Sequence, residues 1–143
     1  MPNRRAHDHI GAYHFRVEIE GVTQGAFTSV SGLEGDTEVI EYKDGQDRNL
    51  RTRPGRTRYS NIVLRRGYTA NPELFDWYRQ TADGVIERKS GSVILLDDSA
   101  QEIQRFNFFE AWPCRWRGCE FDGDDGDALF EEIEIVVEKI ERG

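Results

Sequence analysis

Apolar and polar side chains alternate with a period of two in two segments near opposite ends of the chain. Odd positions in residues 13–19 are aromatic or aliphatic, and even positions are polar. In residues 129–138 one side is almost wholly apolar, and the other is mostly acidic and includes Glu132 and Glu134. This period is typical of a β-strand with one face on a core, because successive side chains of a strand point to opposite faces. The chain is therefore expected to be mainly β.

Further strand patterns lie between these two segments. They cover residues 26–30, 39–42, 59–64, 92–97 and 102–109, the last of which continues into Pro113. Because proline lacks a backbone N–H, we expect the strand to bulge, bend or lie at a sheet edge at Pro113.

One helix is predicted, beginning at Asn71-Pro72-Glu73 and ending at Asp83-Gly84. Asparagine caps helix N-termini, proline suits the first helical position, and glycine commonly follows the last turn. Leu74, Trp77 and Tyr78 recur three and four residues apart and form one apolar stripe. Together the elements predict a β-barrel or sandwich of about seven antiparallel strands with one α-helix against it, in one domain that spans residues 1–143.

A long polar insert separates the strand patterns at 39–42 and 59–64. It is too long for a tight hairpin turn. Between positions 48 and 58 it has no acidic residue and five arginines, which are Arg48, Arg51, Arg53, Arg56 and Arg58. We expect residues 43–58 to leave the barrel as a long basic arm, with Pro54-Gly55 as the turn at its tip.

Charge is distributed unevenly along this chain, whose net charge is −8. Residues 120–143 hold ten carboxylates against Lys139 and Arg142. An acidic loop in this region contains Asp124, Asp125 and Asp127. Opposite patches on one chain favour head-to-tail self-association, and two solvated faces without a partner are the alternative that the sequence leaves open. The acidic balance disfavours nucleic acid as the main partner, because an acidic protein repels phosphate.

No set of residues has the spacing of a catalytic or metal site. All three histidines lie in or just after residues 1–11, a polar stretch expected to be a flexible arm, which disfavours a histidine-based triad. The acidic loop lacks the spacing of an EF-hand. Cys114 and Cys119 have no histidine nearby and are expected to be thiols rather than zinc ligands or a disulfide. The sequence therefore predicts neither an enzyme nor a cofactor.

The start of the chain, MPNRRAHDHIGAYHF, is polar. It contains no apolar core of signal-peptide length, and no segment of the sequence is long and apolar enough to cross a bilayer. We therefore expect the protein to be made and folded in the cytoplasm.

Several segments follow one another in a recognisable order between residues 13 and 142. They are FRVEIEG, FTSVSGLEGDTEVIEYKDG, RTRPGRTRYSNIVLRRG, NPELFDWY, FNFFEAWPCRWRGCEFD and EEIEIVVEKIER. In this order they resemble the tail-tube family of contractile phages and phage-like contractile injection systems. The resemblance implies a small β-barrel with one helix, like the hemolysin-coregulated protein of type VI secretion. It implies no enzyme activity and no cofactor.

The resemblance also implies an assembly. Six copies would form a ring, rings would stack into a hollow tube, and the sheets of neighbouring copies would join into one inner barrel. A contractile sheath would drive the tube through a target membrane, as part of a phage tail or of a released or anchored phage tail-like particle. The implied partners are further copies of the chain, the sheath protein, baseplate and tube-initiator proteins, and protein cargo in the channel.

Within such a tube, the arm at residues 43–58, including Pro54, is expected to pack on the next ring. Its arginines would meet carboxylates there, and the expected counterparts are Asp124, Asp125 and Asp127. Glu132 and Glu134 would face the channel, and an acidic channel suits protein cargo better than a genome. Two alternatives stay open: a tube-initiator or baseplate-proximal subunit of the same machine, and a monomeric β-barrel binding module that uses the basic arm on nucleic acid or an acidic protein.

Overall fold

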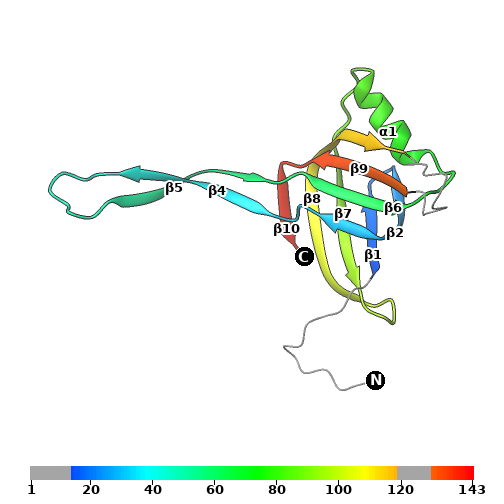
Figure 1. The fold of residues 1–143 in the computed structure, drawn as a ribbon, viewed down its shortest axis with the longest axis horizontal. Coiled ribbons are helices and arrows are strands. Elements are labelled where there is room, and N and C mark those ends of the chain that lie inside the picture. The colour runs from blue at the N-terminus through cyan, green and yellow to red at the C-terminus, as the bar shows by residue number, and fades with distance from the viewer. Residues whose placement is uncertain (1–13, 119–129) are drawn as a thin grey trace, which may run out of the picture.

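The computed structural model describes residues 14–118 and 130–143, and this part of the chain consists mainly of strands with a single helix (Figure 1). The strands are β1 (His14–Ile19), β2 (Thr23–Phe27), β3 (Ser29–Ser31), β4 (Gly35–Tyr42), β5 (Arg51–Tyr59), β6 (Ile62–Gly67), β7 (Lys89–Leu96), β8 (Glu102–Arg117), β9 (Phe130–Val136) and β10 (Lys139–Arg142). The helix α1 spans Glu73–Ala82. The mainly β fold with one helix is thus confirmed, whereas the predicted arm at residues 1–11 lies outside the described residues.

Eight of the described strands form one antiparallel sheet that curls back on itself, and seven of them follow one another in a single path. Their order is β2-β1-β7-β8-β9-β6-β3, and β10 pairs with β8 beside this path. β2 and β3 stand at opposite ends of this order, yet only Thr28 separates them in the chain. The Thr28 N–H donates to the carbonyl oxygen of Arg65 in β6 at 2.8 Å. The two ends of the sheet therefore meet, and the sheet forms a barrel.

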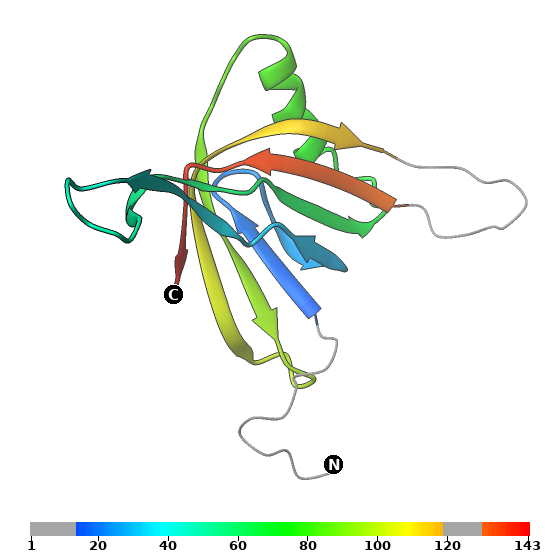
Figure 2. The ribbon, with the colours of Figure 1, turned by 60° about the vertical axis from the view of Figure 1, so that its left-hand side comes forward.

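The long strand β8 runs through both halves of this barrel (Figure 2). It bends where Glu110 has a φ of 56°, and its register with β7 shifts at the same place, between the pairs Gly91–Phe108 and Lys89–Ala111. Its register with β9 shifts again between Pro113 and Arg115. Of the bulge, bend or edge position predicted at Pro113, the structure shows a bulge.

The helix α1 begins and ends where the sequence predicts. The Asn71 side-chain oxygen accepts a hydrogen bond from the Glu73 N–H at 3.1 Å, and Gly84 follows the helix with a φ of 89°. Leu74 and Trp77 are buried in the core, and α1 packs against β8. The predicted apolar stripe is therefore the face through which the helix joins the barrel.

The core consists of inward side chains from most strands of the barrel together with two from the helix. Its buried members are Val17, Ile19, Phe27, Ile62, Leu64, Leu74, Trp77, Val93, Phe108, Ala111, Ile133, Ile135 and Val137. Burial alternates along β9 with a period of two, as the sequence predicts. No helix among the described residues is long and apolar enough to cross a membrane.

The strand predicted at residues 59–64 is wrong as a single element. β5 ends at Tyr59 and β6 begins at Ile62. The Ser60 N–H leaves the strand ladder to donate to the Glu34 carbonyl at 3.0 Å, and Gly32, with a φ of 91°, approaches the backbone of Asn61. A Cβ at position 32 would lie 1.9 Å from the Asn61 carbonyl oxygen, so only glycine fits this crossing.

A candidate assembly surface on the projecting hairpin

β4 and β5 form a separate antiparallel hairpin that projects from the barrel (Figure 1). Their register runs from Gly35–Tyr59 at the root to Tyr42–Arg51 at the outer end. The arm predicted at residues 43–58 therefore exists, but it begins at Gly35 and includes a second strand.

The tip predicted at Pro54-Gly55 is wrong. Pro54 pairs with Val39 in mid-strand, and residues 43–50 connect the two strands. The Asp47 N–H donates to the Asp44 carbonyl in this connection at 2.8 Å. A Pro-Gly pair serves a turn and a β-bulge alike, because an edge strand tolerates proline and a bulge tolerates glycine. The sequence alone did not separate these two uses.

A β-bulge in β5 sets the direction of the arginine side chains. The register shifts between the pairs Thr37–Thr57 and Val39–Pro54, so that Glu38 faces two residues of β5, Gly55 and Arg56. A Cβ on Gly55 would lie 2.9 Å from the Ile40 side chain, so glycine keeps this crowded position open.

Because of this bulge, the arginines of β5 share one face of the hairpin. Arg51 and Arg53 stand opposite Tyr42 and Ile40, and Arg58 stands opposite Asp36, all three at even positions of β4. Arg56 lines a surface hollow with Asp36, Glu38 and Arg58. If all of residues 51–58 alternated strictly, with no bulge, Arg51 and Arg53 would lie on one face and Arg56 and Arg58 on the other. We call this side the arginine face, defined by Arg51, Arg53, Arg56 and Arg58.

The opposite side of the hairpin is almost free of charge. We call it the threonine face, and its members are Thr37, Val39, Glu41, Thr52, Pro54 and Thr57. The hydroxyls of Thr37 and Thr57 are hydrogen-bonded at 2.8 Å. Val39 is 66% exposed, the highest exposure among the large hydrophobic side chains described.

Charge also changes along the arginine face. Near the root, Asp36 and Glu38 lie beside Arg56 and Arg58. Farther out, the residues opposite Arg51 and Arg53 are uncharged, and the Arg51 side chain donates to Asp47 at 2.6 Å.

The hairpin and the barrel differ in net charge. Residues 35–59 hold six of the 19 basic and five of the 27 acidic residues, so they carry +1 and the rest of the chain carries −9. The predicted counterparts Asp124, Asp125 and Asp127 lie outside the described residues.

Glu132 and Glu134 lie on the exterior of the barrel, on β9. Arg65 and Arg117 are the cross-strand neighbours of Glu132, and Arg117 lies 3.5 Å from its carboxylate. Glu134 faces Arg115 and accepts a hydrogen bond from Asn61 at 2.9 Å. Arginines of β6 and β8 therefore stand beside these carboxylates, and the channel-facing role of Glu132 and Glu134 stays a prediction.

Cys114, at the bulge next to Pro113, is a free thiol. Its sulfur lies 3.5 Å from the Glu134 carboxylate. Burial raises the pKa of the Cys114 thiol to about 11, and the nearby negative charge of Glu134 adds to the shift. The protonated thiol is the stable form at neutral pH.

A buried ion pair inside the barrel was not predicted. Glu131 and Arg66 are only 7% and 9% exposed at the side chain, and their charged groups are 2.8 Å apart. The Trp116 N–H donates to the same carboxylate at 3.1 Å. The available signal was the one acidic residue, Glu131, on the otherwise apolar side of residues 129–138.

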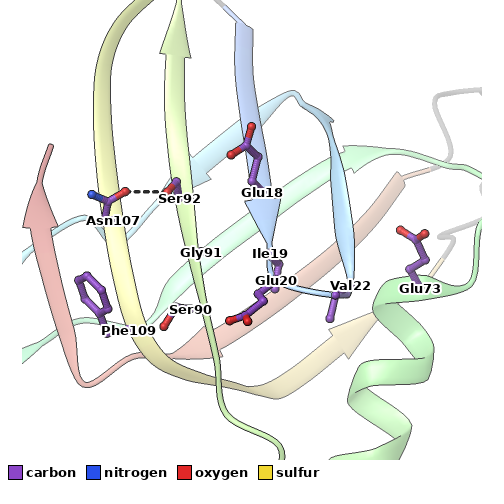
Figure 3. A pocket seen from close by; sticks show the side chains of 11 residues that line it. Glu18, Ile19, Glu20, Val22, Glu73, Ser90, Gly91, Ser92, Asn107 and Phe109 are labelled. Atoms are coloured by element: carbon purple, nitrogen blue, oxygen red, sulfur yellow. Dashed lines mark hydrogen bonds between the residues drawn. The ribbon is translucent and has the colours of Figure 1, made fainter.

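A hollow lies outside β1 and β7, and both polar and apolar side chains line it (Figure 3). Ser92 donates to the Asn107 side-chain oxygen at 2.6 Å, and Glu18 lies 3.6 Å from Arg16 and 3.7 Å from Arg105. These polar groups pair with one another within β1 and across strands of the sheet, which is the arrangement of a polar sheet surface. Nowhere in residues 14–118 or 130–143 do three His, Cys, Asp or Glu side chains group so as to hold a metal ion.

The described residues form a curled sheet with one packed helix and a hairpin that leaves the barrel. The family model of the T4-like virus tail tube protein gp19 matches residues 11–141. The chain belongs to this tail tube family, and the resemblance stated from the sequence is confirmed.

Solved structures agree with this assignment. A chain of the PVC sheath–tube complex, an extracellular contractile injection system in its extended state, is 28% identical, with a TM-score of 0.84 over 96% of this chain and 93% of that chain. A chain of the PVC sheath/tube terminator in the extended state is 29% identical, with a TM-score of 0.83 over 97% and 99%. Hcp1 from Flavobacterium johnsoniae shares the fold, at 24% identity and a TM-score of 0.58 over 92% and 95%. No curated protein matches the chain.

Proposed function

We propose that this chain is the structural inner-tube subunit of a contractile injection machine. Copies assemble into hexameric rings, the rings stack into a hollow tube inside a contractile sheath, and the tube carries cargo through a target membrane. The role is structural rather than catalytic. Membership of the tail tube family and the likeness to a chain of a sheath–tube complex support this proposal.

The observation that carries the proposal is the projecting hairpin. β4 and β5 pair with each other outside the barrel sheet, and Val39, Tyr42 and Leu50 remain exposed on the strands and their connection. A two-stranded hairpin is marginally stable by itself in water, so one of this length is expected to be held by another chain.

The proposed partner of the arginine face is the adjacent ring. Arg48, Arg51, Arg53, Arg56 and Arg58 would contact carboxylates of that ring, with Asp124, Asp125 and Asp127 as the counterparts. An exposed ion pair contributes only about 0–1 kcal/mol, but the contact repeats at each copy of every ring and sets their register.

Negative-stain electron microscopy of the purified protein, with light scattering at low and high salt, tests the proposal. Rings or tubes with a central hole are expected, with stacking that weakens as salt rises, because salt screens exposed charges. A strict monomer at every concentration would contradict self-assembly and favour an initiator subunit or a monomeric binding module.

A second candidate is a subunit at the end of the tube, such as an initiator near the baseplate. It is favoured by the 29% identity to a chain of a sheath/tube terminator structure, similar to the identity with the sheath–tube complex. Rings that never stack without added partner proteins would support this candidate over the main tube subunit.

Two surfaces of the barrel are candidates for the lining of the channel. Glu132 and Glu134 stay the predicted lining, and the polar surface outside β1 and β7 is the rival, since it is concave and carries Ser92 and Asn107 (Figure 3). Cysteines placed at Glu132 or Ser92 in assembled tubes discriminate the two. The channel-facing site reacts with a small maleimide and is protected from one coupled to a large polymer.

A further inference from the structure

The large exposed hydrophobic side chains gather mainly in two places. Val39, Tyr42 and Leu50 lie on the hairpin. Most of the others lie before, on or after α1, and they are Tyr68, Phe75, Val85 and Ile86. The hairpin and α1 lie at different ends of the molecule (Figure 1). A chain with apolar side chains exposed at two separate ends can bury them head to tail against its own copies.

On the hairpin, the threonine face rather than a strand edge is suited to such a contact. Pro54 offers no N–H to a neighbouring strand, and the bulge at Gly55-Arg56 interrupts the ladder beside it. Both features protect an edge against pairing with another strand. On the threonine face, Val39 stands opposite Pro54 and is 66% exposed.

Near α1, the most exposed apolar pair follows the end of the helix. Val85 and Ile86 are 59% and 60% exposed. Phe75, by contrast, is 37% exposed and packs edge-on against Trp116, with ring centroids 4.7 Å apart. Val85 and Ile86 therefore form the apolar surface on the barrel that is most open to another chain.

Charge favours a second copy of this chain as the occupant. The hairpin carries +1 and the remainder of the chain −9, so the hairpin of one copy is attracted to the barrel of another.

We infer that the threonine face of one copy packs, through Val39, on Val85 and Ile86 of a second copy, while the arginine face remains turned to a different surface. The hairpin is then clamped on both faces, by an apolar contact and by a charged one. This inference rests on the proposed tube assembly, and it adds a contact that salt does not weaken.

Cross-linking in mixed tubes tests the contact. In a background with Cys114→Ser and Cys119→Ser, one chain carries Val39→Cys and another carries Ile86→Cys, each with a distinct mass tag. We expect a short bismaleimide to give the mixed dimer in tubes and none in the dissociated protein. Ser99→Cys, in the turn between β7 and β8, replaces Ile86→Cys as the matched control.

The outcomes separate the inference from the proposed function. Tubes that form normally but give no more Val39–Ile86 dimer than the Ser99 control would overturn the inference and leave the tube assignment intact. A chain that forms no tubes under any condition would remove the proposed function, and the inference with it.

A second readout uses salt. Val39→Ser is expected to raise the protein concentration needed for assembly about tenfold, because it removes the burial of two methyl groups, and the effect should persist at high salt. An effect of Val39→Ser that vanishes at high salt would contradict an apolar contact.

Discussion

At the scale of single residues, the barrel interior contains a buried carboxylate, Glu131, which the sequence pattern indicated only weakly. Glu131 occupies an inward position of β9 and meets Arg66 and Trp116 there. Alternation predicted the inward direction correctly. It did not predict the partner, because Arg66 and Glu131 are 65 positions apart in the chain. A local sequence pattern does not show which strands pair.

Removing this carboxylate should destabilise the barrel strongly. Glu131→Ala leaves the Arg66 guanidinium buried without its partner, and breaking a buried ion pair typically costs about 3–5 kcal/mol. Urea unfolding followed by tryptophan fluorescence measures the loss. The control is Glu132→Ala on the exterior of the same strand, which should cost less than about 1 kcal/mol. Equal losses in the two variants would contradict the role of the buried pair.

Cys114 should be an unreactive thiol at neutral pH. The thiolate is the form that alkylates, and burial beside Glu134 raises the pKa of Cys114 to about 11. We expect its iodoacetamide rate, followed by peptide mass spectrometry, to stay low at pH 8 and to rise as the pH approaches 11.

The unfolded chain in urea is the reference for this rate. Since the pKa of the folded thiol lies above its ordinary value of 9.0, the thiol's contribution to stability is present below pH 9 and is lost as the pH rises toward 11. A folded-state rate at pH 8 equal to the unfolded rate would refute the shift.

At the scale of elements, strong periodic patterns predicted the structure well. β1, β9 and α1 lie where their apolar alternation or stripe indicated, and the bulge at Pro113 follows from its missing N–H. The sequence pattern did not predict β5 as a strand, because arginine and threonine alternate in it and neither face is apolar. A strand that buries nothing in its own chain gives no hydrophobic signal, and this is also why the hairpin points to an external partner.

The bulge in β5 allows a test that alters the faces of the hairpin while leaving its composition nearly unchanged. Inserting one threonine after Glu38 gives β4 a partner for the extra residue of β5. The ladder then becomes regular, and Arg51 and Arg53 move to the face opposite Arg56 and Arg58. We expect tubes to be lost while the thermal unfolding midpoint of the barrel stays within a few degrees of the wild type. Sedimentation and calorimetry measure the two quantities.

Deletion of Gly55 is the matched control for this insertion. It also removes the bulge and makes the ladder regular, but it keeps Arg51, Arg53, Arg56 and Arg58 together on one face. Assembly should therefore persist in the deletion variant. Equal assembly in both variants would show that the shared face is not needed.

At the scale of the whole molecule, the resemblance stated from the sequence identified the family and the barrel. The pattern did not reveal that the barrel closes through β2 and β3, or that Glu132 and Glu134 have arginine neighbours, because both depend on which strands lie side by side. The order of short segments shared with a family predicts the architecture. Predicting the charge pattern of a surface also requires the register of every strand that forms it.

The last prediction concerns assembly through charge. Reversing both outer arginines, as Arg51→Glu with Arg53→Glu, should block stacking and leave the monomer folded, because both side chains lie on the hairpin outside the barrel sheet. Light scattering and electron microscopy measure stacking, and circular dichroism measures the fold. The control with the same change in net charge is Arg79→Glu with Arg142→Glu, in α1 and β10.

The control pair distinguishes a local contact from the charge of the whole molecule. Each double reversal makes the chain four charges more negative, so general repulsion between copies rises equally in both variants. If the hairpin arginines contact carboxylates of the neighbouring ring, only the hairpin variant stops stacking, and raising the salt does not restore it, because salt weakens the attraction that the wild type uses. Loss of tubes in both variants, with recovery at high salt in both, would instead assign the effect to net charge and count against the arginine face as the stacking surface.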